Sequence, residues 1–111
     1  MVVKRFEVWL VNLEPIPIAI GSREINKTRP CLVISPAVVN KHLNTITVAA
    51  MTSTIKPYPT RVACVFQKHQ GQIALDQIRS VDKIRFVKKL GIMDKRTCAI
   101  VCDLLAELFK P

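Results

Sequence analysis

The chain has 111 residues, half of them hydrophobic and 23% charged, a composition that excludes a disordered tail and fits one domain over residues 1–111. Seventeen Lys and Arg against eight Asp and Glu give a formal charge of +9. That charge predicts a polyanionic partner, either nucleic acid or an acidic protein, although a basic surface can also serve only to keep a protein in solution. No signal peptide follows Met1 and no window approaches the ~20 apolar residues of a membrane span, so we expect a cytoplasmic protein without membrane contact.

The N-terminal third is expected to hold two strands separated by a long loop. Residues 5–11 alternate and predict the first strand, with Phe6, Val8 and Leu10 on one face. Residues 12–28 contain two prolines, a glycine and several charges, and a loop of this length in a small domain is usually functional. Pro30 then opens an apolar run over 31–34, which predicts a strand buried on both faces.

The rest of the chain predicts further strands and one terminal helix. A helical turn is expected within 36–42, a strand over 45–51, and a hairpin of 61–66 with 72–75 across a turn at 68–71. Residues 85–89 predict a short strand, and Asp94 is a good N-cap for the last helix. One broad face of that helix carries Thr97, Cys98, Val101, Leu104, Leu105 and Leu108. Strands followed by one helix predict a mainly β fold, a small barrel capped by the helix.

The four cysteines lie in apolar runs, and we expect reduced thiols with no disulfide. Cys98 and Cys102 are one helical turn apart, which leaves a metal site as an alternative. Because no His lies beside them, we interpret both as buried apolar residues and expect no metal or other cofactor.

Three places combine strand ends with reactive side chains. Arg29 ends the long loop, and its planar, permanently charged guanidinium suits a phosphate, although it can equally be a surface arginine. The hydroxyls of 52–54 can bond phosphate oxygens or cap a turn, and Asp76 can act as a carboxylate base or form a turn. His42 and His69 fall in expected turns without a partner, so we do not favour them as catalytic bases.

Five segments together resemble one family. They are 21–36 (GSREINKTRPCLVISP), 49–53 (AAMTS), 58–62 (YPTRV), 75–83 (LDQIRSVDK) and 85–91 (RFVKKLG). In this order they resemble the MazF/PemK toxins, which carry a G-S-E segment, T-R-P before an apolar strand, a strand ending in T-S, and a D-Q-I-R block. The resemblance covers most of the chain.

The resemblance implies an SH3-like β-barrel of the MazF/Kid/CcdB type with a C-terminal helix, working as a homodimer. It implies the toxin of a type II toxin–antitoxin system, an endoribonuclease that cuts single-stranded RNA (mRNA) at short sequences without a metal. Attack by the 2′-hydroxyl would leave 2′,3′-cyclic phosphate and 5′-hydroxyl ends. A cognate acidic antitoxin of the MazE/PemI type would cover the same groove, in keeping with the positive charge of the chain.

The same resemblance implies roles for single residues. Arg29 and Thr52 would be the principal catalytic residues. Glu24, Asp76 and Gln77 would be catalytic or RNA-binding. Further RNA-binding residues would be Lys27, Thr28, Ser53 and Arg79.

Four departures from the family pattern stand out. Arg23 interrupts the G-S-E segment, and residues 15–20 lengthen the loop. Phe6 stands where a Gly usually precedes the acidic residue of the first strand. Ala74 stands where some members carry an Arg that has been proposed as a proton donor.

Two other functions compete with the ribonuclease. A CcdB-like toxin on the same barrel would poison DNA gyrase, but it would need its terminal helix rather than the T-R-P and T-S segments. A non-catalytic RNA-binding barrel would need aromatic stacking platforms, and one Trp and one Tyr are few for that purpose.

Overall fold

A computed structural model describes residues 1–13 and 28–111 of the chain. The described elements, in chain order, are β1 (Glu7–Asn12), β2 (Thr28–Val33), α1 (Ala37–His42), β3 (Thr45–Thr52), β4 (Arg61–Phe66), β5 (His69–Ala74), a 3-10 turn (Leu75–Gln77), β6 (Arg79–Asp82), a second 3-10 turn (Lys83–Arg85), β7 (Phe86–Ile92) and α2 (Lys95–Phe109). No helix in these two ranges is long and apolar enough to cross a membrane.

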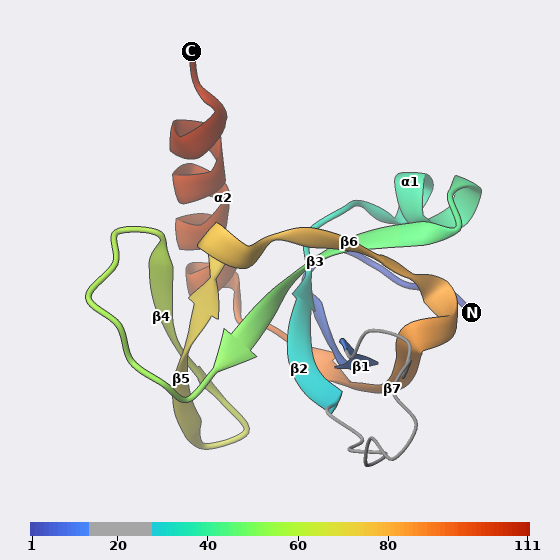
Figure 1. Cartoon of the computed structure of the whole chain (residues 1–111), viewed down its shortest axis with the longest axis horizontal. Helices are drawn as coiled ribbons and strands as arrows, with labels where there is room; N and C mark the ends of the chain where they lie inside the picture. The colour runs from blue at the N-terminus through green and yellow to red at the C-terminus, as the bar shows by residue number, and fades with distance from the viewer. Residues whose placement is uncertain (14–27) are drawn as a thin grey trace, which may run out of the picture.

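The strands of the described residues form one curled antiparallel sheet in the order β4-β5-β3-β2-β1-β7, with β6 pairing β3 off this path. β3 pairs with β2 and also with two further strands in succession: its first half pairs with β6 and its last two residues pair with β5. The sheet therefore bends at β3 and closes into a half-barrel, with the β4–β5 hairpin swung to one side (Figure 1). The predicted mainly β fold with a terminal helix is confirmed.

Two buried clusters hold the two faces of this sheet. β2 contributes to both, since Leu32 belongs to the cluster under α2, while Cys31 and Val33 belong to the cluster inside the half-barrel. All three side chains are fully buried, as the apolar run predicted. Burying a side chain of this size typically stabilises a fold by about 1.5–3 kcal/mol, so these three side chains hold β2, and with it Arg29 near the start of the strand, in place.

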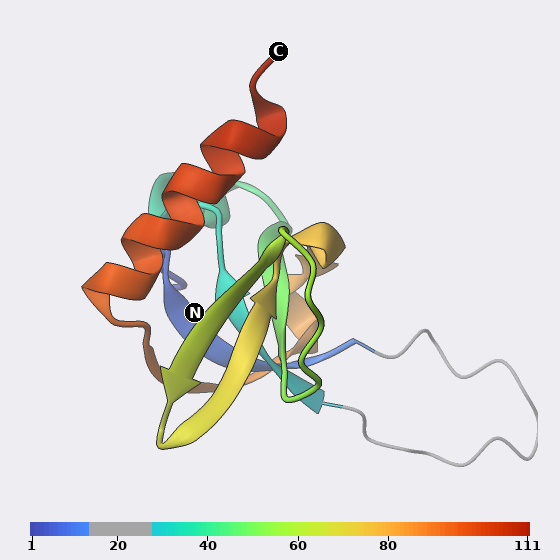
Figure 2. The same cartoon turned by 90° about the vertical axis from the view of Figure 1, so that its left-hand side faces the viewer.

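The terminal helix lies across the β4–β5 hairpin, and its last turns rise past the sheet (Figure 2). It starts where predicted, because the carboxylate of Asp94 accepts the N–H of Thr97 at 2.9 Å. That backbone bond, first among several, holds the pKa of Asp94 below its ordinary value. Thr97, Cys98 and Val101 are buried against the hairpin, whereas the helix end, with Phe109, is exposed.

The first strand differs from its prediction at both ends. It spans Glu7–Asn12 and not 5–11, and two register shifts against β7 break the expected alternation, so Val11 is fully buried and Leu10 only partly. Phe6 precedes the strand with a φ of 70°, in the left-handed region that glycine adopts without strain. The Phe6 N–H donates to the Val33 carbonyl at 2.8 Å, and the Phe6 carbonyl accepts from the Met93 N–H, so the backbone is held in this conformation. A Gly suits the position because it adopts such a φ without strain.

Three further expectations were wrong in detail. The hairpin turn is Gln67–Lys68 and not 68–71, and both residues have positive φ, as a two-residue type I′ turn requires. β6 was missed because only Val81 of its four residues is buried, so the strand carries no apolar alternation. Cys102 was expected to be buried and is exposed, since it lies off the face of α2 whose buried residues are Thr97, Cys98 and Val101.

Candidate active site

Arg29 and Thr52 face each other at the open end of the half-barrel. β2 pairs with β3 in a register that matches Cys31 with Ala50, and continuing that register by two residues sets Arg29 opposite Thr52. The Arg29 side chain is exposed. In the described part of the chain, no hydrogen bond or ion pair engages its guanidinium. Its five N–H donors are therefore available to an anion.

The hydroxyl of Thr52 is oriented by its own turn. The Thr54 backbone N–H donates to Thr52 Oγ1 at 3.1 Å, so the oxygen already has one donor and its own proton is free to point elsewhere. Thr52 is the last residue of β3, and pairing with Gln72 of β5 fixes its backbone. The strand end thus presents one O–H donor on the same wall as Arg29.

A strongly basic pocket of about 470 Å³ lies on one side of this wall. Besides Arg29 and Thr52 it is lined by three further cationic side chains, Lys56, Arg61 and Arg79, and by Gln77. No carboxylate lines it within 1–13 and 28–111. Arginine and lysine clustered without counter-charges are the usual environment of phosphate groups.

Asp76 lies beside this pocket and is engaged by Arg61. The Arg61 Nε donates to Asp76 Oδ1 at 2.9 Å, and the Thr60 hydroxyl donates to the same oxygen at 3.1 Å. The bond from Arg61 is the main reason why the pKa of Asp76 lies below its ordinary value. A carboxylate held in this way is a weak base, and its geometry points to a role in positioning Arg61.

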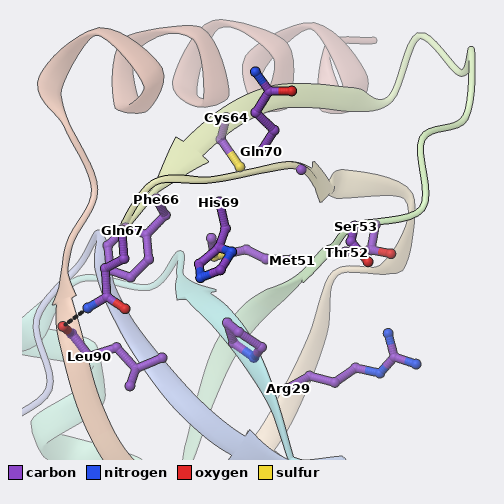
Figure 3. Close-up of a pocket in the computed structure, with 12 residues that line it drawn as sticks. Arg29, Met51, Thr52, Ser53, Cys64, Phe66, Gln67, His69, Gln70 and Leu90 are labelled. Carbon is purple, nitrogen blue, oxygen red and sulfur yellow. Dashed lines mark hydrogen bonds between the residues drawn. The ribbon is translucent and has the colours of Figure 1, made fainter.

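A second, largely apolar pocket of about 340 Å³ lies on the other side of Arg29 and Thr52. Its walls come from β2, the end of β3, the β4–β5 hairpin and β7. Figure 3 shows Thr52 and Ser53 on one side, with the Arg29 guanidinium extending beneath them, and Gln67 with Leu90 on the opposite side. The His69 imidazole lies between the two sides. The expectation that His69 sits in a turn is corrected: the turn is one residue earlier, so His69 begins β5 and lines this pocket.

The two thiols near the site, Cys31 and Cys64, are unreactive. Burial raises the pKa of Cys64, which lines the apolar pocket. Burial raises the pKa of Cys31 to about 12, although the charges of Arg79 and Arg29 act in the opposite direction. A thiol with that pKa stays protonated at neutral pH and is not a nucleophile. Among the described residues, no three His, Cys, Asp or Glu side chains gather where they could hold a metal ion.

The predicted site residues separate into groups. The structure brings Arg29, Thr52, Ser53, Gln77 and Arg79 together around the two pockets. Thr28 is the first residue of β2 and lines neither pocket. Glu24 and Lys27 lie outside the described residues.

Sequence reasoning missed several residues of the site, among them Arg61, Gln67, Lys56 and His69. Lys56 sits in a proline-rich loop, where a lone lysine carries no pattern, and it reaches the pocket because Gln72 bonds both the N–H and the carbonyl of its backbone. His69 would have been found by placing the hairpin turn at Gln67–Lys68.

Residues 4–109 match the sequence profile of the family described as PemK-like, MazF-like toxin of type II toxin–antitoxin system. The chain belongs to this family. It is 34% identical over 100 residues to Endoribonuclease EndoA of Bacillus subtilis (strain 168), an alignment that covers 85% of this chain and 83% of that protein. The resemblance drawn from the five sequence segments is confirmed.

Solved structures agree with the fold of this toxin. MazF (Form-I) from Deinococcus radiodurans is 26% identical, with a TM-score of 0.80 over 100% of this chain and 99% of that one. An endoribonuclease in complex with its cognate antitoxin from Mycobacterial species is 22% identical, with a TM-score of 0.78 over 98% and 97%. The predicted barrel of the MazF type with its C-terminal helix is thereby confirmed.

Proposed function

We propose that this toxin cuts single-stranded RNA at short sequences, without a metal ion, and that Arg29 and Thr52 carry the reaction. As a PemK-like, MazF-like toxin related to an endoribonuclease of Bacillus subtilis, the chain is an endoribonuclease. The observation that carries the finer proposal is the wall between the two pockets, where a guanidinium without an ion pair among the described residues and an oriented hydroxyl face the same space. Both are donors suited to the oxygens of one phosphate.

The reaction follows from what these two groups supply. The RNA 2′-oxygen attacks the neighbouring phosphorus and gives its proton to solvent. The bond from phosphorus to the 5′-oxygen breaks, and that oxygen takes a proton from solvent. The extra negative charge on the phosphorane is stabilised by Arg29, while Thr52 donates to a non-bridging oxygen; a preorganised donor of this kind is typically worth ~2.7–4 kcal/mol. Arg29 keeps its proton at neutral pH and therefore cannot serve as the base.

The remaining predicted residues bind or position the substrate. Arg79 and Gln77 line the basic pocket and hold flanking phosphates, together with Lys56. Ser53 lies next to Thr52 at the pocket edge. Asp76 holds Arg61 in place rather than accepting a proton, because its carboxylate is already engaged. Roles for Glu24, Lys27 and Thr28 in RNA binding stay predictions from the family resemblance.

Two protein partners complete the proposal. The toxin works as a homodimer, and a cognate acidic antitoxin inhibits it by covering the basic pocket. A structural neighbour was solved with its own cognate antitoxin. The net charge of +9 favours an acidic segment in the same place, as do Arg29, Lys56 and Arg79, which line the basic pocket and make no ion pair within the described residues.

Product chemistry in the presence of EDTA tests the proposal. A long RNA incubated with the pure protein and excess EDTA should give fragments with 5′-hydroxyl ends that polynucleotide kinase labels directly, and 2′,3′-cyclic phosphates at the other end. Fragments with 5′-phosphates, or a reaction that stops on chelation and returns with a divalent ion, would refute the metal-independent route. An intact RNA together with inhibited DNA gyrase would favour the gyrase-poisoning alternative.

A further inference from the structure

The two pockets beside Arg29 and Thr52 differ in chemistry, so they cannot hold the same part of the substrate. The basic pocket is suited to phosphates. Pro30, Met51 and Phe66 are among the residues that line the apolar pocket, and they offer no partner to a charged group. Its volume of about 340 Å³ is at the lower end of the ~300–1,000 Å³ of pockets that bind small organic groups. A nucleobase, flat and apolar on its faces and polar at its edges, is the part of RNA that fits such walls.

The polar group on the far wall of this pocket is fixed in orientation. The Gln67 Nε2 donates to the Leu90 carbonyl at 2.9 Å. A carbonyl can only accept, so the amide nitrogen must face Leu90 and the amide oxygen must face the other way. In Figure 3 that oxygen lies on the pocket side of the bond to Leu90. The pocket therefore presents a hydrogen-bond acceptor opposite Arg29.

The backbone around Gln67 holds this acceptor in place. Gln67 and Lys68 form the tight turn of the hairpin, with φ values of 49° and 67°. The neighbouring Phe66 ring packs on Gly91 so closely that a Cβ added there would lie 3.0 Å from the ring. The acceptor thus sits on a short turn anchored to β7 on both sides, through Phe66 and through Leu90.

We propose that the apolar pocket binds the nucleobase next to the scissile phosphate, and that Gln67 selects a base with an amino group at purine C6 or pyrimidine C4, adenine or cytosine. Guanine has its amino group at C2 and carries a carbonyl at C6. This inference rests on the proposed function, since it takes the scissile phosphate to lie at Arg29 and Thr52. Adenine N6 and cytosine N4 offer the donors that the Gln67 oxygen requires, whereas uracil offers a carbonyl at the equivalent edge position. The His69 ring and the Phe66 ring supply the surfaces against which the base lies.

Binding selection on uncleavable RNA tests this proposal apart from catalysis. A random pool of 2′-fluoro RNA lacks the attacking hydroxyl, so the wild-type protein binds it without cutting. The bound fraction should be enriched in adenine or cytosine at one position by about tenfold, a typical size for one well-placed base contact. In Gln67→Met, which keeps the side-chain length and loses the amide, that enrichment should fall below about threefold. Gln67→Asn tolerates the positive φ and is too short to reach the pocket wall, so it should lose the preference too.

Lys68→Met is the matched control, because it places the same residue in the same turn without lining the pocket. It should weaken binding evenly across the pool and keep the base preference. The proposal would be overturned if the preference persists in both Gln67 variants, or if the wild-type protein shows no preference for adenine or cytosine. Cleavage of ordinary RNA by the wild-type protein is scored separately. If the wild-type protein cleaves RNA but the Gln67 variants keep its base preference, the base pocket alone is refuted. If the wild-type protein does not cleave RNA, the proposed function is refuted.

Discussion

Thr52 contributes to the site through one atom, and the effect of that atom can be isolated. Thr52→Val keeps the β-branched shape that suits the end of β3 and removes only the hydroxyl, which should lower the cleavage rate about 100-fold. Thr52→Ser retains the hydroxyl and should keep most of the rate, which a purely structural role in packing would not explain. The measurement is the initial rate on a fluorescent RNA under saturating conditions. Thr45→Val, at the opposite end of the same strand, should be neutral; equal losses in both valine variants would contradict the assignment.

At this scale the sequence predicted the residues whose chemistry is evident and missed those that depend on geometry. Arg29 before a proline and hydroxyls at a strand end identify phosphate-binding groups by type and position, and the structure places Arg29 and Thr52 on one wall. For Asp76 the sequence left a base and a turn former open, because it cannot reveal that Arg61, fifteen residues away, binds the carboxylate. The approach of Lys56 is equally invisible, since only the fold brings its loop to the pocket.

Among the elements, the contact between β3 and β5 is the one that most directly supports the site. A Cβ added to Gly71 would lie 2.6 Å from the carbonyl oxygen of Thr52, so the backbones of the two strands approach so closely here that only a glycine fits. Gly71→Ala should therefore displace the end of β3, lower the free energy of unfolding by about 2 kcal/mol and reduce cleavage at least tenfold, since overpacking typically costs about 1–3 kcal/mol. Urea unfolding and initial rates measure the two effects.

Gly91→Ala is the control for this prediction. A Cβ at Gly91 would meet the Phe66 ring at 3.0 Å, and a side-chain ring can shift by a few tenths of an ångström where a backbone carbonyl cannot. Its loss of stability should be clearly smaller than that of Gly71→Ala. The opposite order would mean that β3 and β5 can separate without cost.

An ion pair between the buried Glu7 and the exposed Lys89 joins β1 to β7, and Glu7 makes stability depend on pH. Burial raises the pKa of Glu7, but hydrogen bonds from the Lys4 N–H, Trp9 and Lys89 more than offset it, so the pKa lies below its ordinary value of 4.5. The folded state therefore favours the charged carboxylate. Its contribution is complete above pH 4.5 and is lost as the pH falls through the lowered value in the folded protein.

Glu7→Gln keeps an acceptor for Trp9 and loses the charge that Lys89 binds at 2.9 Å. At pH 7 it should be less stable than the wild type by about 1–2 kcal/mol, because a hydrogen bond to a charged group is typically worth about 1.5–3 kcal/mol and solvent around the exposed Lys89 screens this one. Towards pH 3 the two proteins should converge, because the wild-type carboxyl becomes protonated. Urea unfolding at several pH values and one fixed protein concentration checks this. A constant difference across the range would exclude a linkage through Glu7.

The elements themselves were predicted well where burial imposes a pattern and poorly where backbone geometry decides. β2 and α2 were found because one contains the apolar run 31–34 and the other is capped by Asp94, although β2 begins at Thr28, before the predicted start. The hairpin turn was misplaced because Gln67–Lys68 lacks the Asn-Gly or Asp-Gly pair that usually marks a type I′ turn, whereas Gly71 resembled a turn residue and proved to be a close strand contact.

For the whole molecule, the net charge is +9, and four of the seventeen Lys and Arg side chains line the basic pocket. Binding of a 2′-fluoro RNA should weaken with salt, and the slope of log affinity against log salt should fall by about 0.7 for each phosphate contact removed from a single strand. Lys56→Ala and Arg79→Ala should each show this change by fluorescence anisotropy. Lys95→Ala, an exposed lysine at the start of α2 and outside the pocket, should not. Equal slopes in all three variants would mean that RNA is attracted by the overall charge and not held at this pocket.

The central claim is that Arg29 stabilises the charge that develops on the scissile phosphate. The most direct test is the initial cleavage rate of Arg29→Ala relative to wild type, in EDTA, with circular dichroism and gel filtration to confirm an unchanged fold and assembly. Because Arg29 is exposed and makes no ion pair within the described residues, its removal should leave stability intact. The account predicts a loss of at least about 100-fold, as expected for a preorganised donor to a developing oxyanion. A folded variant that keeps more than about a tenth of the wild-type rate would contradict it.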